Sequence, residues 1–183
     1  QLKIMGIEAV KSSTPAPCRD KIKEALKIIM QGTEKDVNNF IQEFREEFMQ
    51  LSPEEIAFPR SVNGIEKWSS GANIFMSGTP MHCKGAILYN HFVKKQKLTG
   101  KYPLIQNGEK IKFLNMRTPN PMQSNVISFM TKLPKELDIH KYLDYDKQFD
   151  KAFVEPLTFI MNQIGWNIDR SYGTQTTLED FFG

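Results

Sequence analysis

Two stretches near the start of the chain place apolar residues at the spacing of an amphipathic helix. The first follows the capping signal Ser13-Thr14-Pro15, with proline expected at the first helical position, and ends before Gly32. Its apolar residues are Ile22, Leu26, Ile28 and Ile29. Thr33 is the expected cap of the second helix, with Asp36 at the capping-box distance. The stripe of this second helix comprises Val37, Phe40, Ile41, Phe44, Phe48 and Leu51.

The middle of the chain combines short elements with a long connection. Ser52-Pro53 followed by two glutamates predicts a short helical turn. Residues 61–80 are rich in Gly, Ser and Asn, which predicts an irregular connection anchored by Trp68 and Phe75. Apolar residues flanked by basic ones over 82–95 then predict a helix.

The last third of the chain contains a strand pattern and a long helix pattern. Strict alternation over 110–113 after a glycine-containing turn predicts a strand with lysines on one face, and 126–130 is its expected partner. Asp144 is expected to cap a helix that Pro156 kinks and that ends at Gly165. Its expected buried stripe is Phe149, Phe153, Leu157, Ile160 and Ile164. The pattern predicts an α+β fold dominated by helices, with a small β-hairpin or sheet and an extended C-terminal tail.

Length and composition indicate a folded protein with one large domain or one domain with appendages. The chain has 183 residues, of which 40% are hydrophobic, and this content can furnish a sizeable core. It contains no run of eighteen apolar residues and no signal-peptide pattern, so we expect an intracellular protein. Cys18 and Cys83 lack metal-binding spacing and are expected to be buried thiols. Because the chain begins with Gln1 in an apolar stretch, we expect it to be a piece of a longer protein.

The charge of the chain is unevenly distributed. Residues 61–120 contain nine basic and two acidic residues, whereas residues 31–60 contain three basic and seven acidic residues. This polarity indicates one surface that meets a polyanion and another that faces water, although lysines that only solubilise a surface give the same count.

Several residues invite a catalytic interpretation. Asp144-Tyr145-Asp146 has the spacing of carboxylates that bind two divalent metals, but an aspartate at a helix start is also what capping favours. His82, Cys83 and His91 could ligate a metal, but no fourth ligand is evident, and a packed or phosphate-contacting His82 is the better interpretation. The chain contains none of the common nucleotide-binding, zinc-protease or serine-hydrolase motifs. We therefore predict no catalytic residue, no metal site and no cofactor in this chain.

Four landmarks follow one another along the chain: KIMGIEAVKSSTP, PMHCKGAILYNHFVKK, GEKIKFLNMRTPNP and YLDYDKQFDKAFVEPLTFIMNQIGW. Together they resemble, in order, the C-terminal thumb region of the replicative family B DNA polymerases of T-even-like bacteriophages. The resemblance implies that residues 1–12 end the palm domain and lead into the thumb, that 13–166 form the thumb, and that 167–183 form a flexible tail. It also implies that the catalytic carboxylates and the two magnesium ions of the full polymerase belong to parts outside this chain.

A polymerase thumb must hold primer–template duplex without reading its sequence, so its contacts should fall on phosphates. The resemblance implies that Lys3 and Lys11 face the primer strand near its growing end, with Ser12 and Ser13 as phosphate donors. It implies a further set of contacts along the duplex behind them. These are His82, Lys84, Lys94, Lys95, Lys110, Lys112 and Arg117.

The chain ends with QTTLEDFFG, in which Gln175, Leu178, Phe181 and Phe182 have the spacing of a sliding-clamp-binding peptide. In one helical turn, Leu178 and Phe181 project from the same side and can enter one apolar pocket, with Phe182 beside them. The alternative is a tail that packs its aromatic residues onto its own domain.

The sequence thus predicts the thumb portion of a viral DNA polymerase, with duplex DNA, a sliding clamp and the rest of the polymerase as partners. It is expected to act in the cytoplasm of an infected bacterial host. The alternatives are a stand-alone DNA- and clamp-binding accessory protein, a natural split-polymerase subunit, and a small metal-dependent nuclease that uses Asp144 and Asp146.

Overall fold

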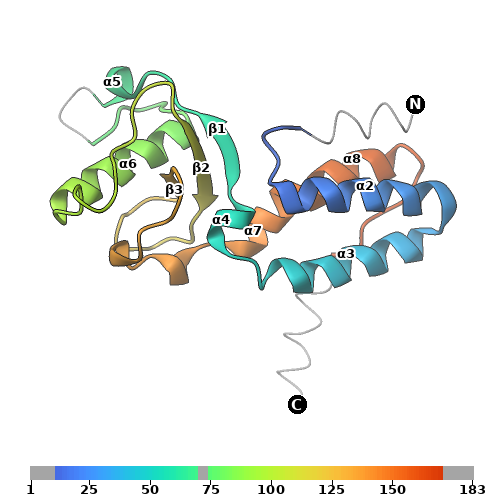
Figure 1. Ribbon diagram of the computed structural model, residues 1–183. Coiled ribbons are helices and arrows are strands. Elements are labelled where there is room, and N and C mark those ends of the chain that lie inside the picture. Colours follow the sequence, from blue (N-terminus) through green and yellow to red (C-terminus); the bar gives the residue numbers. More distant parts are fainter. Residues whose placement is uncertain (1–10, 70–73, 171–183) are drawn as a thin grey trace, which may run out of the picture. The chain divides into compact units, whose positions relative to one another are not determined.

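The computed structural model describes residues 11–69 and 74–170 and divides the chain into two compact units (Figure 1). Unit 1 consists of Gln1–Lys11, Ala16–Gln50 and Phe149–Gly183, and unit 2 consists of Ser12–Pro15 and Leu51–Gln148. Helices dominate the described residues, and a small antiparallel sheet lies in unit 2. The predicted α+β fold class is therefore confirmed.

The first two helices of unit 1 are α2 (Ala16–Gln31) and α3 (Glu34–Phe48), which run antiparallel (Figure 1). The Thr33 hydroxyl accepts a hydrogen bond from the Asp36 N–H, and the Asp36 carboxylate accepts one from the Thr33 N–H at 2.9 Å, so the predicted capping box is confirmed. Helix α2 begins one residue after Pro15, so the prediction that this proline is the first helical residue is wrong.

The predicted final helix is formed by three consecutive segments: α7 (Tyr145–Phe149), the π-helix η3 (Asp150–Val154) and α8 (Glu155–Asn162). The π-helical turn lies immediately before Pro156, whose ring and missing N–H disturb the regular hydrogen-bond ladder. The kink predicted at Pro156 stays a prediction, and the π-helical turn was not predicted. Because α8 ends at Asn162, Ile164 lies beyond the helix and is 40% exposed, so its predicted burial is wrong.

The core of unit 1 is an aromatic cluster. Phe44 and Phe153 are 4.8 Å apart between ring centroids, and Phe48 and Phe149 are 5.2 Å apart, both in edge-to-face geometry. All four rings are at most 3% exposed. Edge-to-face pairs at such distances stabilise a core beyond the burial of their area. The phenylalanines that the two helix patterns assigned to buried stripes therefore meet.

Unit 2 contains a three-stranded antiparallel sheet in the order β1 (Phe58–Ser61), β2 (Lys110–Asn115), β3 (Val126–Phe129). The predicted pairing of β2 with β3 is confirmed, with Phe113 opposite Ser128. Strand β1 was not predicted. It is short and carries Pro59, which is tolerated because β1 is an edge strand.

Helix α6 (Met81–Lys95), which the sequence predicted, packs on β3 and β2 (Figure 1). The Ser128 hydroxyl donates to the His82 carbonyl oxygen at 2.9 Å. A Cβ atom at Gly85 would lie 2.4 Å from the Ser128 Oγ and 2.7 Å from the Ser128 backbone nitrogen, so only glycine allows this approach. The predicted helical turn is α4 (Pro53–Ile56), and α5 (Ile65–Trp68) lies in the segment that was predicted to be irregular.

A buried polar clasp joins three parts of unit 2. Gln148, which is fully buried, accepts hydrogen bonds through Oε1 from the Asn115 backbone N–H at 2.8 Å and from Asn115 Nδ2 at 2.6 Å. Its Nε2 donates to the Ile56 carbonyl oxygen at 2.9 Å. The side-chain amide thus links α7, β2 and the end of α4. Two 3₁₀ turns, η1 (Lys135–Leu137) and η2 (His140–Tyr142), precede α7.

Cys18 and Cys83 are both free and buried, as predicted. Burial raises the pKa of the Cys18 thiol to about 12, so this thiol is protonated at neutral pH. Within the ranges that the structure describes, no helix combines the length and apolarity needed to cross a bilayer.

Candidate nucleic-acid interface

The predicted DNA contacts near the N-terminus are only partly within the described residues. Lys3 lies outside them, as do the four predicted clamp-binding residues Gln175, Leu178, Phe181 and Phe182. Lys11 and Ser12 are exposed, and Ser13 is half-buried. Lys11 belongs to unit 1, whereas Ser12 and Ser13 belong to unit 2.

His82 at the start of α6 lies near the Arg60 guanidinium of β1, and we call these two residues the Arg60 cluster. Lys84 lies two positions further along α6. Arg60 pairs with Ile111 in the β1–β2 ladder, which places it on the face of the sheet that carries Phe113 and Ser128 and that α6 covers. The Lys84 Nζ lies 3.3 Å from the Asn125 Oδ1 and 4.9 Å from the centroid of the Phe75 ring. Arg60 was not among the predicted contacts, because it falls in the acidic block of the sequence and only the strand register brings it here.

Within the Arg60 cluster, the histidine is neutral at pH 7. Burial lowers the pKa of His82 below its usual value, and the nearby Arg60 guanidinium lowers this pKa further. His82 can therefore offer a phosphate a hydrogen bond but no charge at neutral pH. The cation of the Arg60 cluster is Arg60, and Lys84 is a separate cation of the same helix start.

The start of α6 also suits an anion because of its backbone. Pro80 occupies the N-cap position without a side-chain hydrogen bond, and the first turn contains no acidic residue. The unpaired N–H groups of a helix start and its macrodipole favour negative charge. Together with Arg60 and Lys84, this end of α6 forms a positively charged surface.

Lys94 and Lys95 lie at the other end of α6 and are both exposed. Ten residues separate Lys94 from Lys84, which corresponds to about 15 Å along a helix axis. The structure thus distributes these predicted contacts along one helix and does not gather them at one point.

The two lysines of β2 have different surroundings. Lys110 is exposed, whereas Lys112 is half-buried and its Nζ donates to the Glu54 carbonyl oxygen at 3.1 Å. Lys112 is opposite Phe129 in the ladder, and its neighbour Phe113 is opposite Ser128, which contacts α6. Because side chains alternate along a strand, both lysines lie on the face away from α6. The prediction of one lysine-bearing face is confirmed, but this face differs from that of the Arg60 cluster.

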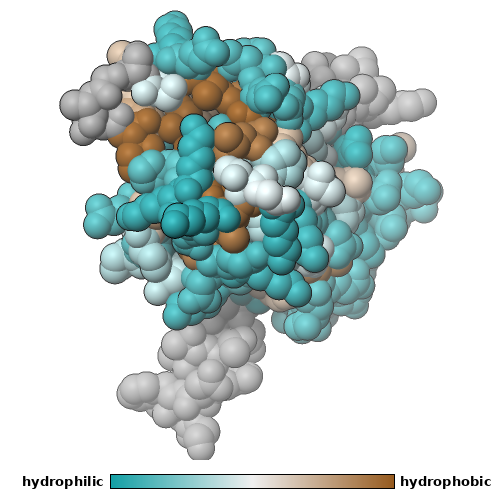
Figure 2. Space-filling view, turned by 60° about the vertical axis from the view of Figure 1, so that its left-hand side comes forward, coloured by the Kyte–Doolittle hydropathy of each residue, from teal (hydrophilic) through white to brown (hydrophobic). Residues whose placement is uncertain are grey.

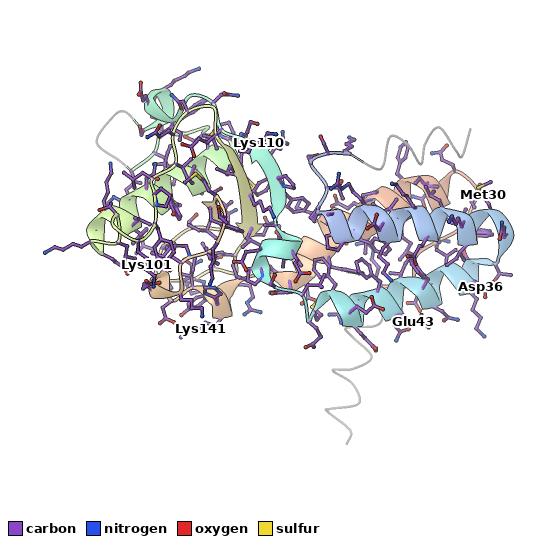
Figure 3. All side chains as sticks on the ribbon, viewed as in Figure 1. Met30, Asp36, Glu43, Lys101, Lys110 and Lys141 are labelled. Carbon is purple, nitrogen blue, oxygen red and sulfur yellow. The ribbon has the colours of Figure 1, made fainter. Side chains whose placement is uncertain are left out.

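Arg117 follows β2 and is held by the segment around η2. Its guanidinium donates to the Lys141 carbonyl oxygen, and its backbone N–H donates to the Tyr142 carbonyl oxygen at 2.7 Å. Figure 3 shows Lys141 and Lys110 at opposite ends of unit 2. Arg117 and Lys110 therefore do not share one compact site.

The first of the two carboxylates that suggested a nuclease has a structural explanation. The Asp144 Oδ1 accepts a hydrogen bond from the Lys147 N–H at 3.0 Å, so the capping interpretation of Asp144 is confirmed. The Cys83 Sγ donates to the Asn63 carbonyl oxygen at 3.5 Å. Over residues 11–69 and 74–170, no three His, Cys, Asp or Glu side chains come together in a way that could hold a metal ion.

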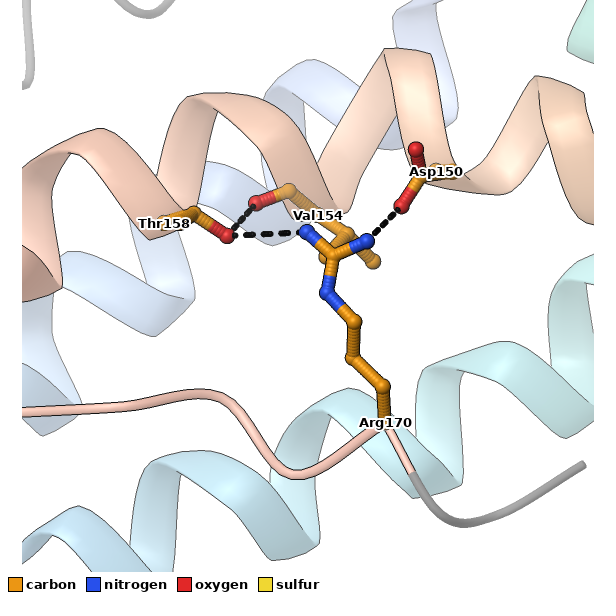
Figure 4. A network of polar contacts seen from close by, with 4 residues as sticks. All are labelled: Asp150, Val154, Thr158 and Arg170. Carbon is orange, nitrogen blue, oxygen red and sulfur yellow. Dashed lines mark hydrogen bonds and ion pairs between the residues drawn. The ribbon is translucent and has the colours of Figure 1, made fainter. Parts of the chain in front are cut away.

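The last described residues of the chain are bonded to unit 1. The Asn167 N–H donates to the Glu34 carboxylate at 2.7 Å, and the Asp169 N–H donates to the Asn38 Oδ1 at 2.6 Å. Figure 4 shows the Arg170 guanidinium between Asp150, at 2.6 Å, and the Thr158 hydroxyl, at 3.4 Å. Residues 167–170, which sequence analysis assigned to the tail, thus have fixed partners on α3, η3 and α8.

Comparison with known proteins finds similarity to DNA-directed DNA polymerases of phages. The chain is 31% identical over 187 residues to the DNA-directed DNA polymerase of Enterobacteria phage T4, and this match covers 100% of the chain. It is 33% identical over 164 residues to the DNA-directed DNA polymerase of Escherichia phage RB69, covering 86% of the chain. The chain spans about a fifth of the length of these relatives, 20% and 17% respectively. No protein-family model matches the chain.

The resemblance indicated by the four sequence landmarks is therefore confirmed. The chain is related along its whole length to a segment of the T4-like phage DNA polymerases.

Proposed function

We propose that this chain is the thumb portion of a family B phage DNA polymerase, that it grips primer–template duplex DNA, and that its C-terminal peptide tethers the enzyme to a sliding clamp. The observation that carries the proposal is the combination of a full-length match to phage polymerases with exposed cations on unit 2. The rest of the polymerase supplies the catalytic carboxylates and the two magnesium ions, so this chain alone does not extend primers. The proposed setting is the cytoplasm of an infected bacterium.

The proposed grip acts on phosphates. Arg60 provides charge beside neutral His82, which provides a hydrogen-bond donor, and Lys84 provides charge further along α6. Lys94, Lys95 and Lys110 are further exposed cations that a duplex can reach. Contacts to phosphates hold every sequence equally well, which is what an enzyme that moves along its template requires.

Salt dependence of binding tests the grip. Each phosphate contact contributes about 0.9 to the slope of log affinity against log salt, so Arg60→Gln and Lys84→Gln should each flatten this slope by about that amount. The measurement is fluorescence anisotropy of a labelled duplex of random sequence titrated with the full chain at several salt concentrations. Lys23→Gln, an exposed lysine of α2 in unit 1, is the matched control. Unchanged slopes for both variants would remove Arg60 and Lys84 from the interface.

The proposed tether rests on the spacing of Gln175, Leu178, Phe181 and Phe182. Burying one leucine and two phenylalanines contributes about 1.5–3 kcal/mol each, and ordering the segment offsets much of this, which suits a releasable contact. Removing the last eight residues should abolish binding of the full chain to immobilised sliding clamp of the same phage and leave binding to a short duplex intact. Equal clamp binding with and without these residues would contradict the tether.

The exposed cations are compatible with a stand-alone accessory protein or a split-polymerase subunit as well. The reading frame next to Gln1 separates these alternatives, because a polymerase continues upstream in the same frame, whereas a split enzyme encodes its palm and fingers in a separate gene.

A further inference from the structure

A groove lies between α5 and α6 of unit 2, and its apolar floor has no role in the proposed grip or tether. Its volume is about 530 Å³, which is within the range of ligand-binding sites. We call it the α5–α6 groove. It is lined by Ile65, Ser69, Ile74, Ile87, Asn90, His91, Lys94 and Lys95.

The floor of the groove is apolar. It is formed by Ile65, Ile74 and Ile87, of which Ile74 is 38% exposed. Figure 2 shows apolar surface gathered in a hollow that hydrophilic residues surround. Covering exposed isoleucine side chains is favourable, because each fully buried side chain of this size contributes about 1.5–3 kcal/mol.

Two of the polar lining residues already form hydrogen bonds within the protein. The Asn90 Nδ2 donates to the Ile105 carbonyl oxygen at 2.9 Å, and the Asn90 Oδ1 accepts from the Ile105 N–H at 2.8 Å. The Ser69 hydroxyl lies 3.4 Å from the Glu66 carbonyl oxygen, to which it donates. Specific polar recognition in the groove therefore falls to His91, Lys94 and Lys95.

The rim of the groove is cationic. Lys94 and Lys95 are exposed in the last turn of α6, and the Lys95 Nζ lies 5.8 Å from the centroid of the Phe92 ring. Among the residues that the structure describes, neither lysine has an acidic partner within 4.0 Å. An apolar floor with unneutralised cations along one side complements a ligand that combines apolar side chains with carboxylates.

We propose that the α5–α6 groove binds a short acidic, amphipathic peptide segment of a partner protein. Its aliphatic or aromatic side chains occupy the space between Ile65, Ile74 and Ile87, and its carboxylates face Lys94 and Lys95. This is the mode in which an amphipathic helix enters an apolar groove. A nucleic acid fits the groove less well, because its lining contains no Phe, Tyr or Trp ring on which a base could stack.

The test uses the full chain and a fluorescein-labelled peptide with leucine and phenylalanine at spacings of three and four and glutamate elsewhere. A second peptide has lysine in place of every glutamate. Anisotropy should show binding of the glutamate peptide at least tenfold tighter than binding of the lysine peptide. The double variant Lys94→Glu, Lys95→Glu should bind the glutamate peptide at least tenfold more weakly than the unaltered chain does. The matched control is Lys132→Glu, Lys135→Glu, two exposed lysines of unit 2 outside the groove.

A variant of the floor separates this inference from the duplex grip, since Lys94 and Lys95 are also proposed DNA contacts. Ile74→Ser should weaken binding of the glutamate peptide at least fivefold. The same variant should leave the affinity for duplex DNA and the salt dependence of that affinity unchanged. Loss of duplex binding in Ile74→Ser, or peptide binding that Ile74→Ser leaves unchanged, would overturn the peptide assignment. Failure of duplex binding in the unaltered chain would contradict the grip and leave the peptide result standing.

Discussion

The interior of unit 1 is stabilised differently from that of unit 2, and the two units have net charges of opposite sign. Unit 1 packs helices around phenylalanine rings, and its residues sum to a net charge of −3. Unit 2 packs α6 closely on a small sheet, contains a buried side-chain amide clasp, and has a net charge of +6. The lesson is that the overall charge of +3 is the sum of one cationic and one acidic unit. The contrast also predicts that each unit has a different point of weakness.

The largest expected effect is in the aromatic core of unit 1. Phe153→Ala should destabilise unit 1 by about 3–5 kcal/mol, because it removes a fully buried ring and leaves a cavity. Hydrogen exchange resolved by segment should show the loss in α2 and α3. The control is Phe159→Ala on α8, a phenylalanine that is 58% exposed and whose removal should cost less than about 0.5 kcal/mol. Similar losses for both variants would refute the aromatic core as the main support of unit 1.

The close approach of α6 to β3 should be the most sensitive point of unit 2. Gly85→Ala should destabilise this unit by about 3 kcal/mol, because the new methyl group would meet backbone as well as the Ser128 side chain. The loss of stability is measured by hydrogen exchange of the β3 amides at increasing urea concentration. At Gly100 a Cβ meets nothing within 4 Å, so Gly100→Ala should not destabilise the protein. A stable Gly85→Ala variant with unchanged exchange would show that α6 can move away from the sheet at little cost.

A smaller loss is expected from the amide clasp. Gln148→Met keeps the approximate volume but leaves the Asn115 N–H and the Ile56 carbonyl oxygen without their partner, which should cost about 2 kcal/mol. Equilibrium urea unfolding measures this value. Gln163→Met, at an exposed position after α8, should change stability by less than about 0.5 kcal/mol. Equal stability of both variants would mean that the clasp is replaceable by apolar contact.

The smallest effect concerns a surface ion pair of unit 2. The Tyr102 hydroxyl, and then the Lys101 ammonium, lower the pKa of Glu136 to about 2 from its usual 4.5. A depressed carboxyl pKa stabilises the folded state above the unfolded pKa, and this contribution is lost as the pH falls towards about 2. Glu136→Gln should therefore reduce the drop in the urea midpoint between pH 5 and pH 2. If this carboxylate does not contribute, the urea midpoint should fall by the same amount between pH 5 and pH 2 in both proteins.

Local signals explain which parts of the fold were predictable. The Thr33–Asp36 capping box and the phenylalanine stripe of α3 depend on residues a few positions apart, so the sequence alone predicts that helix. Strand β1 was missed because its pairing with β2 joins residues about fifty positions apart and its own pattern contains Pro59. The hairpin partner β3 was predictable since it follows β2 closely along the chain.

The candidate interface was predictable in its charge and less so in its geometry. The sequence identified Lys84 and Lys110 but gave no indication that they lie on different faces of the sheet, which depends on strand register. Arg60 was missed for the same reason, because only pairing with β2 brings it to α6. The neutral state of His82 follows from burial and from Arg60, and neither is visible in a residue count.

The bonds of Asn167, Asp169 and Arg170 to unit 1 determine the reach of whatever follows them. Arg170 is followed by residues 171–183, and a segment of thirteen residues extends at most about 45 Å. If the chain were free from residue 167, the same segment would explore a larger volume, and its local concentration at a nearby target would be lower. Three hydrogen-bonded residues thus shorten the distance from unit 1 that the terminal peptide can reach.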